Sequence, residues 1–286
     1  MKIAVTAATG NLGGAIVKSL LKHPSHPEVI GISRNPSKIS QPIIEYRMGD
    51  YSDKSSYQTA FKDIDAVLLV SGMDEPSKRV QQHRNVIEAA IESGVKKIVY
   101  TSIVGNAQEA GFSPVVSSNR KTEADIKQSG LKWCIGRNGL YIEPDIEYVE
   151  NYISAGKISN CAGDGKCGYT TRDELGFAYS EMLLGEQHNG RTYNLVGPTI
   201  TQQDLVDLFN QHFNLDLTYN SMSVEAYQAE RQAELGDFMG QIIAGIYEGI
   251  RSGFADVPSH YEEAAGRLHI DWDSYFQAAA RIWKST

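Results

Sequence analysis

The first half of the chain alternates between short runs of aliphatic and β-branched residues and longer segments with helical spacing. This alternation constrains the fold more than any other feature, because strands joined by helices form a parallel sheet that is covered on both faces. Strands are predicted at residues 2–6, 28–33, 43–47, 66–70, 96–102 and 132–137, and helices at 12–22, 79–94 and 121–130. We therefore predict an α/β fold of the Rossmann type with a doubly wound parallel sheet.

The second half of the chain is less regular. Residues 192–197 predict a strand that returns to the edge of the sheet, and Thr201 is expected to cap an amphipathic helix. From residue 224 onward the chain reads as mostly helical. The expected organisation is a core over residues 1–140, joined by the returning strand, and a smaller, mostly helical C-terminal lobe over residues 141–286 that is interleaved with it.

A glycine-rich stretch, TAATGNLGG, occupies residues 6–14 between the first predicted strand and the first predicted helix. In this context Gly10 would let the backbone approach a pyrophosphate, and Gly13 would let the helix pack close to the sheet. The amides and dipole of the helix N-terminus would face the anion. An ordinary turn that uses glycine for geometry alone is the alternative, but the strands that follow favour a dinucleotide site.

The residues after the second predicted strand indicate which dinucleotide binds. NAD sites place a carboxylate there for the ribose 2′-hydroxyl, whereas NADP sites use arginine for the 2′-phosphate. Here the strand ends at Ser33 and Arg34, Lys38 follows one turn later, and no acidic residue is near. A solvated surface arginine is the alternative interpretation, but the missing acid and the phosphate-binding geometry of arginine favour NADP(H).

Charge and composition exclude several other classes of protein. The formal net charge of −8 disfavours a nucleic-acid-binding protein, which needs a positive surface. No apolar run is long enough to span a membrane, and the N-terminus lacks the pattern of a signal peptide. The three cysteines, Cys134, Cys161 and Cys167, form no CxxC pair, which favours free thiols in the cytoplasm. The scattered histidines predict no metal site. The sequence does not distinguish a homodimer from a monomer.

Several motifs together carry a family resemblance. The segments VTAATGNLG, ISRNPSK, GDYSD, QHRNVIEAAIESGVKKIVYTS, KTEADIKQSG, RNGLY and AGDGK occur in this order. As a set they resemble the NmrA-like branch of the atypical short-chain dehydrogenase/reductases. Within that branch the chain is most similar to the type 2 NAD(P)H:quinone oxidoreductases and the triphenylmethane reductases. The likeness runs from residue 1 to about residue 220 and fades in the last helices.

The resemblance implies a set of cofactor-binding residues. The pyrophosphate would be held by Thr6, Ala7, Ala8, Thr9, Gly10, Asn11 and Leu12, and the 2′-phosphate by Arg34 with Lys38 nearby. Further cofactor contacts are implied for Asp50, Tyr51, Ser71, Gly72, Met73, Arg137, Asn138, Gly139, Leu140, Tyr141 and Arg172. The family usually has glycine where this chain has Ala7. One methyl group is expected to cost little there, unless the position needs a positive φ, at which alanine would be strained.

The usual catalytic pair of short-chain dehydrogenases is missing. None of the 15 tyrosines is followed by a lysine four residues later, and Ser102, at the usual serine position, therefore lacks its partner. Exchange between a carbonyl and an alcohol needs a general acid, whereas a quinone accepts hydride readily because the product anion is aromatic. Candidate substitutes are Asn119, where many relatives carry histidine, and Lys121, Tyr141 and Arg172. A solvated Lys121 and a core-packing Tyr141 are the competing interpretations.

These patterns predict an NADPH-dependent reductase that transfers hydride directly to a quinone or a similar planar, electron-poor acceptor, without flavin or metal. The alternative is an NADP(H)-binding redox sensor of the NmrA type that regulates a partner protein. A third hypothesis keeps the enzyme but changes the substrate to a dye, an azo compound or an aromatic ether.

Overall fold

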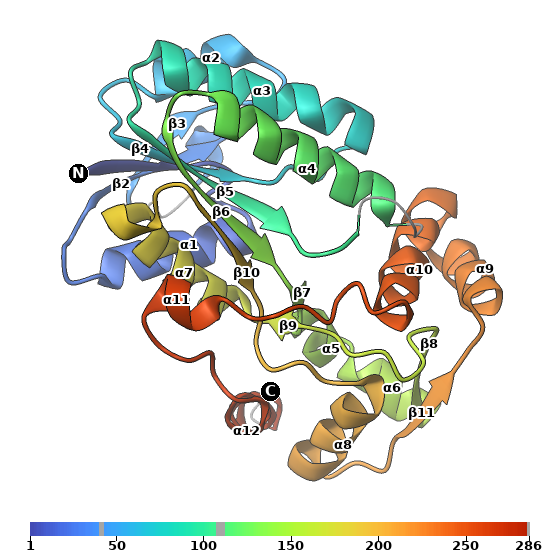
Figure 1. Ribbon diagram of the computed structural model, residues 1–286. Helices are drawn as coiled ribbons and strands as arrows, with labels where there is room; N and C mark the ends of the chain where they lie inside the picture. Colours follow the sequence, from blue (N-terminus) through green and yellow to red (C-terminus); the bar gives the residue numbers. More distant parts are fainter. Residues whose placement is uncertain (40–42, 107–111, 285–286) are drawn as a thin grey trace.

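The computed structural model describes residues 1–39, 43–106 and 112–284, and its centre is a seven-stranded parallel sheet (Figure 1). The strand order is β10-β6-β5-β4-β1-β2-β3, and every pairing within it is parallel. The strands are β1 (Lys2–Val5), β2 (Glu28–Ser33), β3 (Glu45–Met48), β4 (Ala66–Val70), β5 (Lys97–Ile103), β6 (Lys132–Asn138) and β10 (Arg191–Leu195). The doubly wound α/β fold predicted from the sequence is confirmed.

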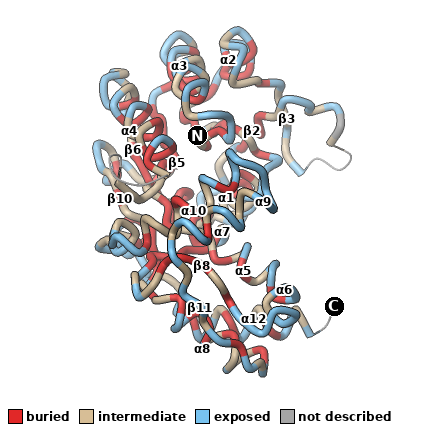
Figure 2. Tube along the Cα trace, turned by 90° about the vertical axis from the view of Figure 1, so that its right-hand side faces the viewer, coloured by how far each residue is buried: buried red, intermediate tan, exposed pale blue. Residues whose placement is uncertain are grey.

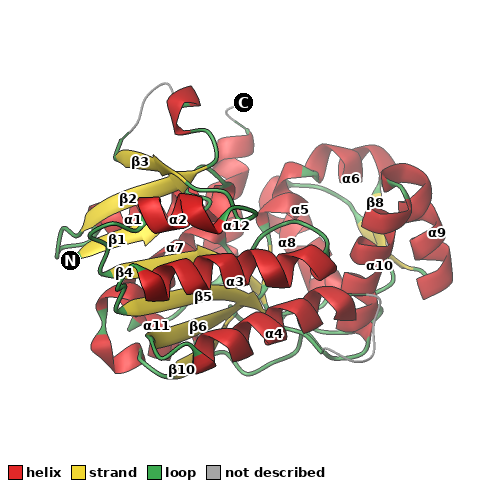
Figure 3. Cartoon of the chain, turned by 90° about the horizontal axis from the view of Figure 1, so that it is seen from above, coloured by secondary structure: helices red, strands yellow, loops and turns green. Residues whose placement is uncertain are grey.

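Helices cover both faces of this sheet (Figure 3). One face carries α1 (Asn11–Lys22), α7 (Arg172–Leu184) and α11 (Tyr261–Ala265), and the other carries α2 (Lys54–Ala60), α3 (Pro76–Glu92) and α4 (Ser113–Gln128). Successive side chains of a strand point to opposite faces, so Ile3 and Val5 join the first cluster and Ala4 the second. Buried residues follow the strands and the helix sides that pack on them (Figure 2).

The strand order places a topological switch at β1. The chain moves outward from β1 to β2 and β3, then returns to the other side of β1 to form β4. Ligands of such sheets bind outside the carboxyl ends of the strands at this point. The loops that follow β1, β2 and β4 therefore meet at one edge of the sheet, where the glycine-rich stretch lies.

The C-terminal lobe is built from helices and two small parallel ladders (Figure 1). One ladder pairs β7 (Leu140–Tyr141) with β9 (Tyr169–Thr170), and the other pairs β8 (Lys157–Asn160) with β11 (Thr218–Ser221). The helices are α5 (Glu143–Glu147), α6 (Val149–Ala155), α8 (Gln202–Phe213), α9 (Val224–Leu235), α10 (Asp237–Arg251) and α12 (Trp272–Trp283). Thr201 caps α8 through a reciprocal capping box with Asp204, as expected.

The lobe and the sheet are interleaved along the chain. After the first lobe elements the chain returns to the sheet with α7 and β10, which pairs with β6 in parallel register from Arg191 opposite Cys134 to Leu195 opposite Asn138. Two details differ from the expectations. Helix α4 begins at Ser113, several residues earlier than predicted, and α2 follows β3 where no helix was assigned. Within the described residues no helix is long and apolar enough to cross a membrane.

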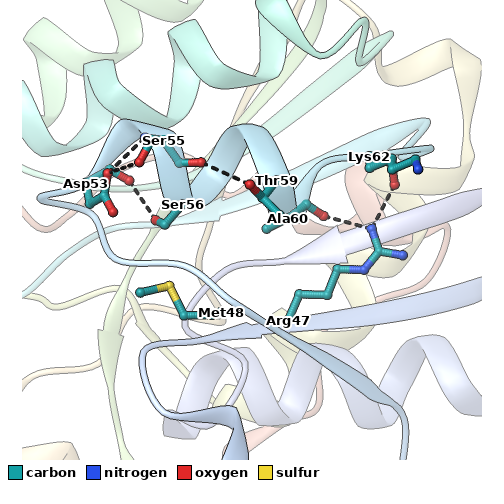
Figure 4. A pocket seen from close by; sticks show the side chains of 8 residues that line it. All are labelled: Arg47, Met48, Asp53, Ser55, Ser56, Thr59, Ala60 and Lys62. Carbon is teal, nitrogen blue, oxygen red and sulfur yellow. Dashed lines mark hydrogen bonds between the residues drawn. The ribbon is translucent and has the colours of Figure 1, made fainter.

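A hollow of about 580 Å³ lies between β3 and α2 at the outer edge of the sheet (Figure 4). Its wall includes Arg47, whose Nη1 donates to the carbonyl oxygens of Ala60 at 2.9 Å and Lys62 at 2.7 Å. Arg47 thereby satisfies backbone carbonyls at the carboxyl end of α2. We interpret the hollow as a consequence of this edge packing.

Candidate cofactor site and active site

The glycine-rich stretch forms a tight turn between β1 and α1. The amide of Gly10 donates to the carbonyl oxygen of Ala7 at 2.9 Å, and no described side chain caps α1, which begins at Asn11. A Cβ atom at Gly13 would lie 2.3 Å from the Ala7 carbonyl oxygen, so only glycine allows this close packing of helix and turn. The first amides of α1 have no intrahelical acceptor and can donate to an anion.

Ala7 adopts the left-handed backbone conformation, with φ of 48°. We expected alanine to cost little here unless the position needs a positive φ. The position does need one, so alanine is strained. An L-residue in this region costs about 1–2 kcal/mol relative to its right-handed conformation. The turn therefore holds a strained residue where glycine would be relaxed.

A cavity of about 880 Å³ opens beside this turn at the carboxyl ends of β1, β2 and β4. Nine residues expected to bind the cofactor line it: Ala7, Thr9, Gly10, Arg34, Asp50, Tyr51, Ser71, Gly72 and Met73. Arg34 is exposed at its wall and makes no ion pair within the described part of the chain. Lys38 ends the short 3-10 turn Pro36–Lys38, and its side chain lies outside the described set.

These features fit a dinucleotide with a 2′-phosphate. The open helix N-terminus and Gly10 suit the pyrophosphate, and the unpaired guanidinium of Arg34 suits the additional phosphate. Asp50 also lines the cavity, but its Oδ1 accepts the amide of Ser52 at 2.9 Å, so part of this carboxylate is used to shape the loop.

Thr6 lies beneath the turn and does not face the cavity. Its amide donates to the carbonyl oxygen of Leu68 at 3.0 Å, and its Oγ1 accepts the amide of Val70 at 2.9 Å. The Tyr51 hydroxyl donates to the Val70 carbonyl oxygen at 2.6 Å, so the Thr6 hydroxyl donates to Tyr51 at 2.8 Å. Thr6 is fully buried, and the expectation that it holds the pyrophosphate is corrected. It joins β1, β4 and Tyr51 instead. Ala8 is buried as well.

The loop after β4 is anchored by a buried histidine that sequence reasoning missed. The amide of Gly72 donates to Nε2 of His83 at 3.0 Å, so Nε2 is unprotonated and Nδ1 donates to Oγ1 of Thr122 at 2.9 Å. Burial, assisted by the charge of Arg79, lowers the pKa of His83 to about 3. His83 therefore stays neutral in one tautomer and fixes the loop that lines the cavity.

Asn119 is part of the same buried support. Its Oδ1 accepts from Tyr100 at 2.6 Å and from Ser71 at 3.1 Å, while its Nδ2 donates to the carbonyl oxygen of Val115 at 2.8 Å. The side chain is fully buried and its partners are all internal. The expectation of a catalytic Asn119 is therefore corrected to an anchor for Ser71. Lys121 is exposed on α4 and does not line the cavity, so its catalytic role stays a prediction and the solvated interpretation is the simpler one.

Glu123 binds two arginines below the carboxyl ends of β5 and β6. Arg137 donates to it through Nε at 2.9 Å and Nη2 at 2.7 Å, and Arg120 donates through Nη1 at 2.7 Å. Burial raises the pKa of Glu123, but the bonds and charges of both arginines outweigh it and hold that pKa below its usual value. Ser102 donates to the same carboxylate at 2.7 Å. The guanidinium of Arg137, expected at the cofactor, is therefore engaged in this ion-pair cluster.

Tyr141 and Arg172 meet where the core joins the lobe. The β7–β9 ladder pairs Tyr141 with Thr170, and the Arg172 guanidinium lies 5.8 Å from the Tyr141 ring centre. Asn138 donates to the Tyr141 hydroxyl at 3.2 Å, and burial raises the pKa of that phenol. Glu143 accepts the amide of Arg172 at 2.6 Å. The structure thus brings three of the expected residues together here, beyond the lining of the 880 Å³ cavity.

The remaining expected residues are placed by tight packing. A Cβ atom at Gly139 would lie 2.1 Å from the carbonyl oxygen of Gly168, and Leu140 donates its amide to that oxygen at 3.2 Å. Asn11 and Leu12 form the first turn of α1. The segment from residue 138 to residue 141 is therefore fixed against the lobe, directly after β6.

Comparison with known proteins identifies the family of the chain. The NAD(P)H-binding family matches residues 7–157 of the chain. Quinone oxidoreductase 2 of Escherichia coli (strain K12) is 31% identical over 260 residues, which cover 88% of each chain. An NmrA-like family domain-containing oxidoreductase of Aspergillus flavus is 28% identical over 219 residues, 74% of this chain and 71% of the relative.

A solved structure has the same fold over nearly the whole chain. The crystal structure of Citrobacter sp. triphenylmethane reductase complexed with NADP(H) superimposes with a TM-score of 0.88 at 30% identity, covering 98% of this chain and 100% of the other. The match includes both the sheet and the lobe. The chain therefore belongs to the NAD(P)H-binding family and is an NmrA-like oxidoreductase.

Proposed function

We propose that this protein is an NADPH-dependent reductase that transfers hydride directly to a quinone or a similar planar, electron-poor acceptor, without flavin or metal. The observation that carries the proposal is the state of Ser102. This serine is fully buried and donates to Glu123, and no tyrosine of the chain is followed by a lysine four residues later. The site therefore lacks the Tyr-xxx-Lys acid of ordinary short-chain dehydrogenases, which favours acceptors that require positioning rather than proton delivery.

Different residues of the chain bind different parts of NADPH. The α1 N-terminus and Gly10 receive the pyrophosphate, and Arg34 receives the 2′-phosphate. Bound NADPH supplies the hydride. Tyr141 and Arg172 offer an aromatic face and a cation where β6 leads into the lobe, a combination suited to stacking with a flat acceptor.

Steady-state assays with NADPH and a small benzoquinone or naphthoquinone test the proposed activity. We expect turnover well above the non-enzymatic rate and inhibition by excess NADP⁺. A protein that binds NADPH but gives no such turnover with a panel of quinones contradicts the proposal.

The choice of NADPH over NADH has its own test. Arg34→Asp should weaken NADPH binding by about 100-fold, because a charge-assisted contact is replaced by repulsion, while NADH binding changes little. Titration of nucleotide fluorescence measures both affinities on the same protein. An equal loss for the two nucleotides would place Arg34 away from the 2′-phosphate.

A redox sensor that binds NADP(H) and regulates a partner is the second candidate, since the inaccessible Ser102 also suits a protein without turnover. Such a sensor must bind NADP⁺ and NADPH with different affinities, because a ligand without differential affinity shifts no equilibrium. Equal affinities, together with quinone turnover, exclude it.

A further inference from the structure

Gln82 on α3 places an unpaired oxygen at the wall of the cofactor cavity. Its side chain is half-buried and is one of those that line the cavity. A Cβ atom added at Gly72, which lines the same cavity, would lie 3.7 Å from Oε1 of Gln82. Oε1 accepts no hydrogen bond from the described residues, although an amide oxygen has two lone pairs. This oxygen is therefore free to accept from a molecule bound in the cavity.

The orientation of the Gln82 amide is fixed by its nitrogen. Nε2 donates to Oδ2 of Asp74 at 3.0 Å and to Oγ of Ser52 at 3.2 Å, so both of its hydrogens are used. The Glu75 amide and the Gln82 side chain hold the pKa of the Asp74 carboxyl below its usual value, and an ionised carboxylate can only accept. Turning the amide over would place its oxygen against this carboxylate. Oε1 is therefore held on the Gly72 side before a ligand binds.

The same contacts join two loops that line the cavity. Ser52 follows β3 and Asp74 follows β4, and Gln82 bridges the two loops from α3. Asn85 on the same helix donates to the carbonyl oxygen of Tyr51 at 2.8 Å and so holds the first of these loops. The Gln82 oxygen is thus fixed in position, and a preorganised group loses little conformational freedom when it binds a ligand.

The adenine base of the cofactor is the group that reaches this part of the cavity. In the proposed arrangement the pyrophosphate lies at the α1 N-terminus and the 2′-phosphate lies at Arg34, so the phosphates occupy the loops after β1 and β2. Adenine is joined to the ribose that carries the 2′-phosphate. Apart from those two loops, the polar wall of the cavity is formed mainly by the loops after β3 and β4 and by Gln82. The base is therefore expected between the loops that Gln82 joins.

We propose that Gln82 recognises the base of the dinucleotide by accepting a hydrogen bond from the 6-amino group of adenine. The inference rests on the proposed binding of NADPH and not on the identity of the acceptor. Adenine carries N–H donors at this position, whereas hypoxanthine carries a carbonyl oxygen there. That oxygen would face Oε1 as a second acceptor, and neither would be satisfied. Gln82 thus makes the site select adenine over a base with an oxygen at C6.

Binding of NADPH and of its hypoxanthine analogue, reduced nicotinamide hypoxanthine dinucleotide phosphate, tests this role by titration of nucleotide fluorescence. The unmodified protein should bind NADPH about tenfold more tightly than the analogue, because one hydrogen bond is replaced by two facing acceptors. Gln82→Met has a similar length but no amide oxygen. It should raise the Kd for NADPH about tenfold and leave the Kd for the analogue within about twofold. Gln81→Met is the matched control, since Gln81 is exposed and donates only to Asn85, and it should change both Kd values by less than about twofold.

The comparison of the two nucleotides separates recognition of the base from support of the loops. If Gln82→Met weakens both nucleotides equally, Gln82 only holds the loops and the proposal is overturned. Equal affinities of the unmodified protein for NADPH and the analogue overturn it as well. Retained binding of the analogue by Gln82→Met shows that this variant is folded. Because binding is measured without an acceptor, a missing quinone turnover refutes the proposed function and leaves the role of Gln82 standing.

Discussion

Ala7→Gly should stabilise the protein, although it deletes a methyl group. Ala7 has φ of 48°, in a region that glycine enters freely and alanine does not. Its side chain is half-buried and packs at the rim of the cluster under α1. Relief of backbone strain therefore competes with two losses, the buried methyl surface and the greater freedom of glycine in the unfolded chain.

The balance can be worked from these terms. Removing the strain of the left-handed conformation stabilises the folded state by about 1–2 kcal/mol. The added entropy of the unfolded chain costs about 0.4–1 kcal/mol, and half of one methyl costs about 0.4 kcal/mol. The net effect is a stabilisation of about 0.5 kcal/mol, which raises Tm by about 1–2 °C for a chain of this size.

Ala8→Gly is the matched control. Ala8 is 2% exposed and does not have a positive φ, so the same change there relieves no strain. It should destabilise the protein by about 1.5 kcal/mol through lost burial and added unfolded-state entropy. The free energies of unfolding of the two variants, measured by heat and by urea, should therefore differ by about 2 kcal/mol. If Ala7→Gly loses as much stability as Ala8→Gly, the strain assigned to this turn does not exist.

Further substitutions probe the site and the lobe. Gly13→Ala should weaken NADPH binding at least tenfold, because its Cβ would lie 2.3 Å from a backbone oxygen, whereas Gly14→Ala, with 3.7 Å to its nearest neighbour, should bind normally in a fluorescence titration. His83→Phe leaves the Gly72 amide without an acceptor and should cost about 1–3 kcal/mol and reduce NADPH affinity, while His83→Gln, which can still accept, should retain more of both. Burial raises the pKa of Asp145 from 3.8 to about 6, so its ionisation destabilises the fold as pH rises from about 4 to 6. Asp145→Asn should accordingly gain up to about 3 kcal/mol in urea unfolding at pH 8 and nothing at pH 4.

The sequence was most informative about features that repeat along the chain. Alternating strands and helices determine the doubly wound sheet, because apolar runs such as 66–70 can be buried only between two helical layers. The cofactor turn was also predictable, since Gly10 and Gly13 stand at a strand–helix junction. The helix after β3 was missed because its short segment of serine, glutamine and threonine has no clear apolar periodicity.

Side-chain partners across the fold could not be predicted. Arg137 and Thr6 carry motif positions of the family, yet the first is engaged by Glu123 and the second by Tyr51 and Val70. Lys121 and Asn119 are two residues apart on α4, which turns one to solvent and the other into the core. Such outcomes depend on which helix face meets the sheet, and a local pattern with scattered polar residues does not define that face.

The late position of β10 in the chain has a consequence for folding during synthesis. Strand β6 ends at residue 138, but its partner β10 begins at residue 191, after the chain has built the first part of the lobe and α7. A nascent chain therefore carries an open, apolar sheet edge until more than fifty further residues have emerged, and such edges promote pairing with other chains. The sheet closes only through contacts between segments distant in sequence, which slows folding. Protection of the β6 edge by chaperones until residue 195 is available would thus favour the yield of folded protein.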